Sequence, residues 1–379
     1  MAKRGRKNDL ITTAIIALCF AVTIVWMCAL IHLAGTSTAA MVDNPLLNGL
    51  LGGALGIGAF YVQLCIHEAG HLVFGLLTGY RFGSFRIGSM MWTRRDGRLC
   101  CKKFSVPGTA GQCLMQAPEP KAGRTPFVLY NLGGVLLNIV TAVVFAGMFL
   151  WLRHVPVFAF ALLCLSAIGW YSALVNGLPM HLRMGNNDGA NVVAITQNPH
   201  RVRDFALQLK VADQLSQGIP VQDMPQEWFE LPSPEEMNNS MAAARAVLVC
   251  KRLVAQGELQ QADQLIAQLL DMEAAIAGVH RTLLICDRIF FELIGQKRPD
   301  ALAKLLSPRQ KKQMRTMQNF PTVLRTNYAI AWLVEKDAVK ARKIQRTFEK
   351  VAEKYPYQAD IAVERKLIAS VEGPVSDSA

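Results

Sequence analysis

Charged side chains are scarce in this sequence of 379 residues, and acidic ones are nearly missing from its first half. Only 18% of the residues are charged, whereas 52% are hydrophobic and the mean hydropathy is +0.24. Of the 28 acidic residues, 22 lie beyond residue 200. This composition excludes an ordinary soluble protein for the part before about residue 185, while the remainder has the composition of a soluble helical segment.

The sequence also lacks a paired cysteine pattern. Its nine cysteines are odd in number, and Cys19, Cys28 and Cys164 lie within apolar stretches. Cys100 and Cys101 are adjacent and lack the CxxC spacing of a zinc-binding pair. These observations argue against both a disulfide framework and a cysteine-held metal.

The net charge of +12 has a local origin. Beyond residue 200 there are 25 basic and 22 acidic residues, so that part is nearly balanced. The excess lies at the N-terminus, residues 3–7, and in segment 80–126, where nine basic residues face only Asp96 and Glu119. Charge placed in this way indicates membrane topology and contact with anionic lipid, not binding of nucleic acid.

Long apolar runs predict a multi-pass membrane protein. Each run is long enough to cross roughly 30 Å of hydrocarbon. The first is too long for a cleaved signal peptide, so we expect a retained anchor. The basic segments place both termini and segment 80–126 in the cytosol, with the cell membrane as the expected location. The four predicted spans are about 10–34, 46–79, 127–152 and 156–180.

Segment 80–126 has the pattern of a small β-hairpin or sheet. Residues 82–92 alternate loosely, a turn signal follows at 95–98, and residues 99–106 continue the pattern. Residues 111–115 can add a third strand. A solvated loop that touches lipid is the alternative interpretation.

The motif that carries chemistry is His-Glu-Ala-Gly-His at 67–71, within the second apolar run. Positions i and i+4 share one face of a helix, so His67 and His71 can bind one metal ion. Glu68 lies beside them and can act as general base toward a water that the metal activates. Ionisable groups at membrane depth are costly and seldom lack a role.

A third ligand is needed. Asp188 is the only acidic residue between Glu119 and Asp204, and it follows the helix-breaking sequence Asn176-Gly177-Leu178-Pro179. A simple turn role before Gly189 is the alternative for Asp188. His181 is the competing ligand.

These motifs resemble those of the site-2 protease family of intramembrane zinc metallopeptidases, over roughly residues 60–195. The HExxH motif is matched at 67–71, and the distal NxxP…DG motif is matched at 176–179 and 188–189. The intermediate Gly-Pro-x-x-Asn motif is matched in part at 134–138. Val135 stands where the family usually has proline, and Pro179 lies nine positions before Asp188, farther than is usual.

The resemblance implies hydrolysis of peptide bonds within or beside membrane spans, with Zn²⁺ as cofactor and His67, His71 and Asp188 as ligands. Asn138 or Asn176 can stabilise the oxyanion or hold the substrate backbone. An interhelical hydrogen bond is the alternative for Asn138.

The C-terminal part is predicted to be helical. We expect a membrane metalloprotease domain at 1–190, a proline-rich linker at 191–239 and a cytosolic helical domain at 240–379. Two stretches, 253–262 and 331–341, resemble tetratricopeptide-like helical hairpins, which usually bind proteins. The expected fold is therefore mainly α: a four-span helical membrane protein with a small β-hairpin insertion and a repeat-like soluble domain.

Two functions follow from these features. The first is an intramembrane endopeptidase that cuts membrane proteins, either membrane-tethered regulators or signal-peptide remnants. The second is a non-proteolytic membrane zinc-binding scaffold that binds protein partners through its helical domain. Glu68 favours the first, because a metal site without turnover needs no base beside its ligands.

Overall fold

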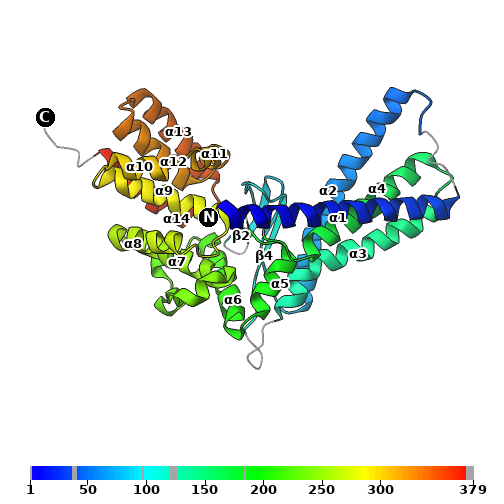
Figure 1. The fold of residues 1–379 in the computed structure, drawn as a ribbon, viewed down its shortest axis with the longest axis horizontal. Helices are drawn as coiled ribbons and strands as arrows, with labels where there is room; N and C mark the ends of the chain where they lie inside the picture. The colour runs from blue at the N-terminus through cyan, green and yellow to red at the C-terminus, as the bar shows by residue number, and fades with distance from the viewer. Residues whose placement is uncertain (1, 36–40, 96–97, 120–125, 183–184, 373–379) are drawn as a thin grey trace.

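The computed structural model describes residues 2–35, 41–95, 98–119, 126–182 and 185–372. The chain is mostly helical, with one small antiparallel sheet. Figure 1 shows the long apolar helices at one end, the C-terminal helices at the other, and the sheet between them.

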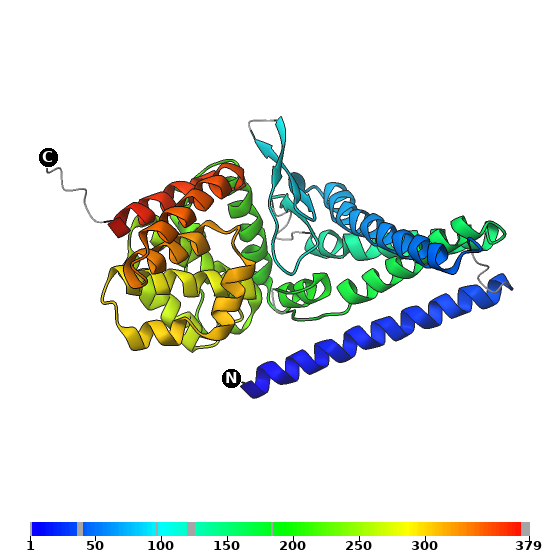
Figure 2. The same ribbon diagram turned by 90° about the horizontal axis from the view of Figure 1, so that it is seen from above.

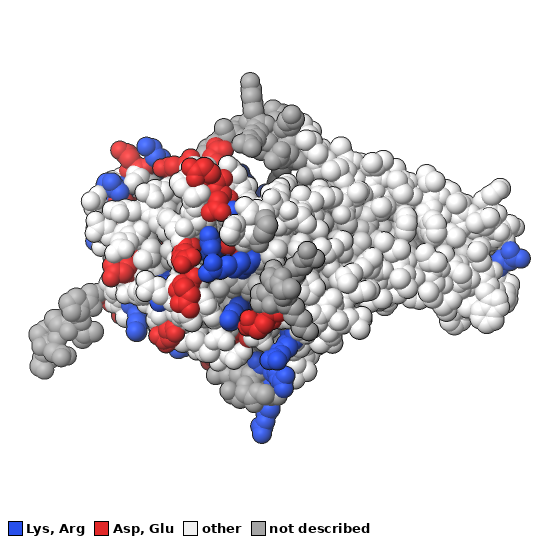
Figure 3. All heavy atoms as spheres, turned by 90° about the horizontal axis from the view of Figure 1, so that it is seen from below, with Lys and Arg blue, Asp and Glu red and all other residues white. Residues whose placement is uncertain are grey.

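Four helices are long and apolar enough to cross a membrane, in agreement with the predicted spans. Pro45 begins the second of them, and the Asn44 side chain caps it by accepting from the amides of Leu46 and Leu47. On the face shown in Figure 3, charged side chains gather over the C-terminal half and are nearly missing from the apolar helices. The four helices are α1 (Ala2–Ala34), α2 (Pro45–Leu77), α3 (Phe127–Trp151) and α4 (Pro156–Gly177).

Helices α2 and α3 approach most closely at the level of the HEAGH motif. A Cβ atom on Gly70 would lie 2.3 Å from the carbonyl oxygen of Gly133, and one on Gly133 would lie 2.5 Å from the oxygen of Gly70. A Cβ on Gly134 would lie 2.6 Å from the His67 ring. Glycine is therefore required on both helices here, and the lack of side chains brings the α3 backbone against the motif.

The predicted β-hairpin is a sheet of four antiparallel strands in the order β3-β2-β1-β4. The stretch 82–92 forms two strands, because Gly88 adopts a positive φ of 57° and reverses the chain. The third strand expected at 111–115 is present and pairs with the first. The strands are β1 (Arg81–Ile87), β2 (Met90–Arg95), β3 (Arg98–Lys103) and β4 (Gly111–Gln116).

Segment 191–239, expected to be a linker, is instead folded against its neighbours. Buried Arg201 pairs with Asp204 at 2.6 Å and also with Glu236, while Arg245 reaches Asp204 at 3.3 Å. Pro220 and Pro225 directly precede short helical turns, and Pro234 begins another. The elements are α5 (Asp188–Thr196), α6 (Pro199–Ser216) and the 3₁₀ turns η1 (Val221–Asp223), η2 (Gln226–Phe229) and η3 (Pro234–Asn238).

The C-terminal helices form an array around one hydrophobic core. This core also contains Met91 and Phe104 from the sheet segment, so the array and the sheet are packed together. Figure 2 shows the array beside the sheet and α1 running along the apolar helices. The helices are α7 (Ser240–Gln256), α8 (Leu259–Asp271), α9 (Gly278–Ile294), α10 (Pro299–Leu305), α11 (Pro308–Thr316), α12 (Pro321–Ala329) with the π turn η4 (Ile330–Val334), α13 (Ala338–Lys354) and α14 (Gln358–Glu372).

Candidate metal centre

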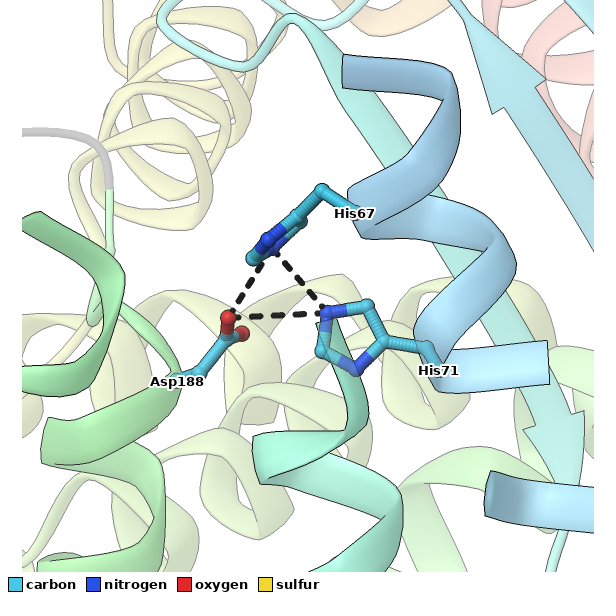
Figure 4. A group of neighbouring side chains, drawn as sticks. All are labelled: His67, His71 and Asp188. Atoms are coloured by element: carbon cyan, nitrogen blue, oxygen red, sulfur yellow. Dashed lines mark hydrogen bonds and ion pairs between the residues drawn. The ribbon is translucent and has the colours of Figure 1, made fainter. Parts of the chain in front are cut away.

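His67, His71 and Asp188 converge on one point (Figure 4). The two Nε2 atoms on α2 are 3.2 Å apart. Oδ2 of Asp188 lies 3.1 Å from Nε2 of His67 and 3.5 Å from Nε2 of His71. The structure thus brings the predicted histidine pair together with the predicted carboxylate, from 117 residues farther along the chain.

Asn187 sets the position of Asp188. Its side-chain oxygen accepts from the amides of Met180 and Ala190, which caps α5. Its side-chain nitrogen donates to the carbonyls of Val175 and Leu178 at the end of α4. Asn187 therefore joins the end of α4 to the start of α5, and the carboxylate of Asp188 is directed to the histidines.

The outer nitrogen of each imidazole is also fixed. Nδ1 of His67 lies 2.7 Å from Oδ1 of Asn138, whose amide nitrogen donates to Gln63. Nδ1 of His71 lies 2.8 Å from the carbonyl oxygen of Tyr130. Both partners are acceptors, so each Nδ1 carries a proton, and Nε2 is the nitrogen of each ring that faces the centre and is left to bind a metal.

The centre therefore contains acceptors that face one another. Oδ2 of Asp188 is buried and accepts no hydrogen bond. Burial by itself raises the pKa of Asp188, but the neighbouring His71 and His67 outweigh it and hold the pKa well below its usual value. Positive charge at this point, either a proton on an imidazole or a metal ion, stabilises the anionic oxygen beside the two rings.

The separations fit a tetrahedral metal ion. With bonds of about 2.0–2.2 Å, such an ion places its ligands roughly 3.3–3.6 Å apart. Of the three separations here, 3.5 Å lies in this range, and 3.1 and 3.2 Å fall slightly short of it. Three protein ligands leave one position for water or substrate, the arrangement of catalytic zinc sites.

Glu68 lies beside the centre without a partner of its own. It is 6% exposed, and within the described parts of the chain its carboxylate has no hydrogen bond. A Cβ atom on Gly111 would lie 2.3 Å from Oε1 of Glu68, so the start of β4 passes directly over the carboxylate. The arrangement leaves a carboxylate free to accept a proton beside the ligand cluster.

The other predicted residues take different positions. The side chain of Asn138 reaches the centre, where it orients His67. The amide of Asn176 donates to the carbonyl of Ser172 in its own helix, 2.9 Å away. His181 is exposed, lies 2.8 Å from Oδ1 of Asn186 and is not part of the cluster.

Sequence reasoning missed three contributors, namely Gln63, Tyr130 and Asn187. Asn187 carried a usable signal, since asparagine before Asp-Gly is a common helix cap. Tyr130 contributes a backbone carbonyl, which any residue supplies.

No family model, no curated protein and no solved structure matches this chain.

Proposed function

We propose that this protein is an intramembrane zinc endopeptidase of the site-2 protease kind. The convergence of His67, His71 and Asp188 beside an unpaired Glu68 carries the proposal. When bound, zinc would polarise the scissile carbonyl and activate a water.

The residues of the chain divide the remaining work. Glu68 accepts the proton of the attacking water and passes it to the leaving amine. Asn138 and the Tyr130 carbonyl keep both imidazoles in the tautomer that binds metal. Burial of His67, Glu68 and His71 excludes bulk water and strengthens these interactions. The oxyanion role predicted for Asn138 or Asn176 stays a prediction.

Four helices that are long and apolar enough to cross a membrane support an intramembrane location for this chemistry. The basic N-terminus and segment 80–126 favour a cytosolic location for both termini and for the sheet. A substrate would be a membrane protein or peptide whose helix unwinds locally, since helical backbone groups are already paired. The C-terminal helices would bind a protein partner, and lysine crosslinking in intact membranes tests that role.

The scaffold alternative is less favoured, because a metal site without turnover gains nothing from a buried carboxylate that lacks a partner. Leaving such a group unpaired costs free energy. Catalysis gives a reason for the cost, whereas binding alone does not.

Glu68→Ala separates the two functions. We expect this variant to keep its zinc, measured by plasma mass spectrometry, and to lose cleavage by a factor of about 100 or more. Comparative membrane proteomics of cells with wild type or Glu68→Ala should then show single-span proteins that accumulate in the variant. His67→Ala is the companion variant and should lose both zinc and cleavage. An unchanged proteome together with full zinc content would favour the scaffold.

A further inference from the structure

Arg86 on β1 is a buried cation that no described carboxylate contacts directly. Its side chain is 1% exposed, and among the described residues no carboxylate lies within 4.0 Å of it. Its Nε atom is buried and has no hydrogen-bond partner. Burying a guanidinium without a contacting carboxylate is unfavourable, so its hydrogen bonds and its position call for an explanation.

The guanidinium joins two turns of the sheet. Nη1 donates to the carbonyl of Gly88 at 2.7 Å. Nη2 donates to Oγ1 of Thr109 at 2.6 Å and to the carbonyl of Gly111 at 3.0 Å. Arg86 therefore holds the backbone of residues 109–111 in place. Hydrogen bonds from a charged donor are stronger than those between neutral groups.

The backbone that Arg86 fixes is the one that touches Glu68. Gly111 lies so close to this carboxylate that any side chain at position 111 would collide with it. Burial lowers the pKa of Arg86, while the charge of Glu68 acts in the opposite direction. The buried cation is thus electrostatically coupled to the proposed general base.

The C-terminal helices hold the other end of the same loop. Phe104 packs edge-on against Phe320 and Tyr355, with ring centroids 5.6 and 5.4 Å away. Asn319 donates to the carbonyl of Ser105. The segment from Phe104 to Gly111 is therefore anchored at one end by the helical array and at the other by Arg86.

We propose that Arg86 is a positioning residue for peptide cleavage, because it holds the 109–111 backbone against Glu68 and thereby sets the place of the base. This inference rests on the proposed function. The guanidinium acts through Thr109 and Gly111 and contacts neither metal ligand nor substrate. Without the hydrogen bonds of the Arg86 guanidinium the start of β4 becomes mobile. Glu68 then no longer packs against a fixed backbone.

Cys113 in β4 reports on this directly, without any substrate. It is 7% exposed, whereas Cys250 in the helical array is 0% exposed and serves as the control for unfolding. We expect Arg86→Met to raise the rate of Cys113 alkylation by N-ethylmaleimide at least about tenfold, with Cys250 still protected. Peptide mass spectrometry measures both rates on the full-length zinc-loaded protein. Arg81→Met, an exposed position on the same strand, should leave both rates unchanged.

The second readout is processing in cells. Arg86→Met should keep its zinc and accumulate the same membrane proteins as Glu68→Ala. Arg86→Lys keeps the charge but reaches fewer acceptors, so its Cys113 rate should fall between those of wild type and Arg86→Met. If Arg86→Met also raises the alkylation rate of Cys250, that variant is unfolding. The Cys113 rate and the processing measured in Arg86→Lys then decide the proposal.

The proposal is wrong if Cys113 in Arg86→Met (or in Arg86→Lys, where that variant decides) is alkylated as slowly as in the wild type. It is also wrong if Cys113 is alkylated faster but the membrane proteins are processed normally. If Glu68→Ala accumulates nothing, the proposed function fails. The Cys113 rates would still show separately whether Arg86 holds the turn.

Discussion

Two buried polar clusters, one at the apolar helices and one in the C-terminal array, are built on opposite principles. In the array, Arg325 is 0% exposed and pairs with Asp287 at 2.6 Å and Glu364 at 3.0 Å. These residues lie on α12, α9 and α14, so the cluster joins three helices. The chain supplies both the cation and the anions.

The cluster of His67, His71 and Asp188 contains no Arg or Lys. Each Nδ1 faces an acceptor, on Asn138 or Tyr130, and Oδ2 of Asp188 lies near both Nε2 atoms without a hydrogen-bond partner. The comparison teaches that burial of charge alone does not identify a functional site. The array cluster contains its own cation, whereas a cation from outside the chain would complete the histidine cluster, which favours a ligand-binding role for it.

The largest expected effect that sharpens this comparison is loss of metal from Asp188→Ala. Removing the only carboxylate of the centre should lower the zinc content from one per chain to below about 0.1 after dialysis. His181→Ala, at the competing position, should keep full zinc. Plasma mass spectrometry measures both, and an unchanged metal load in Asp188→Ala would point to another ligand.

Arg325→Met should act on stability instead. It leaves two buried carboxylates uncompensated, so we expect a loss of about 3–5 kcal/mol in unfolding free energy with unchanged zinc content. The exposed pair Arg365–Glu349 provides the control, because Arg365→Met should cost at most about 1 kcal/mol. Denaturant unfolding followed by circular dichroism tests this. Loss of zinc from Arg325→Met would erase the distinction between the two clusters.

The smallest effect is expected at Asn138, which contacts Nδ1 of His67 and would orient this ring without itself binding the metal. Asn138→Ala should weaken zinc affinity about 10- to 100-fold, measured by competition with a chelator. Thr141→Val is the matched control on the same helix, because the Thr141 hydroxyl donates to the backbone carbonyls of Leu137 and Asn138 in its own helix. Equal affinities for Asn138→Ala and Thr141→Val would show that the bond to His67 contributes nothing.

The local part of the site was predictable from the sequence. His67, Glu68 and His71 follow from helical spacing within an apolar run, and the four spans follow from hydropathy. Asp188 could be selected because acidic residues are so rare before residue 200.

Contacts made by tertiary structure could not be predicted in the same way. The carbonyl of Tyr130 has no side-chain signature, and the role of Gly111 depends on where β4 crosses α2. The turn at Gly88 lies inside a stretch that alternates like one strand. Packing of α6 against the proline-rich segment that follows it depends on the pairing of buried Arg201 with Glu236.

X-ray absorption at the zinc edge of the purified wild-type protein tests the central claim most directly. The account predicts one zinc ion per chain with only nitrogen and oxygen neighbours, at about 2.0–2.2 Å, including two imidazoles. Purified protein that holds no metal, or a zinc ion with sulfur neighbours at about 2.3 Å from the cysteines, would contradict it.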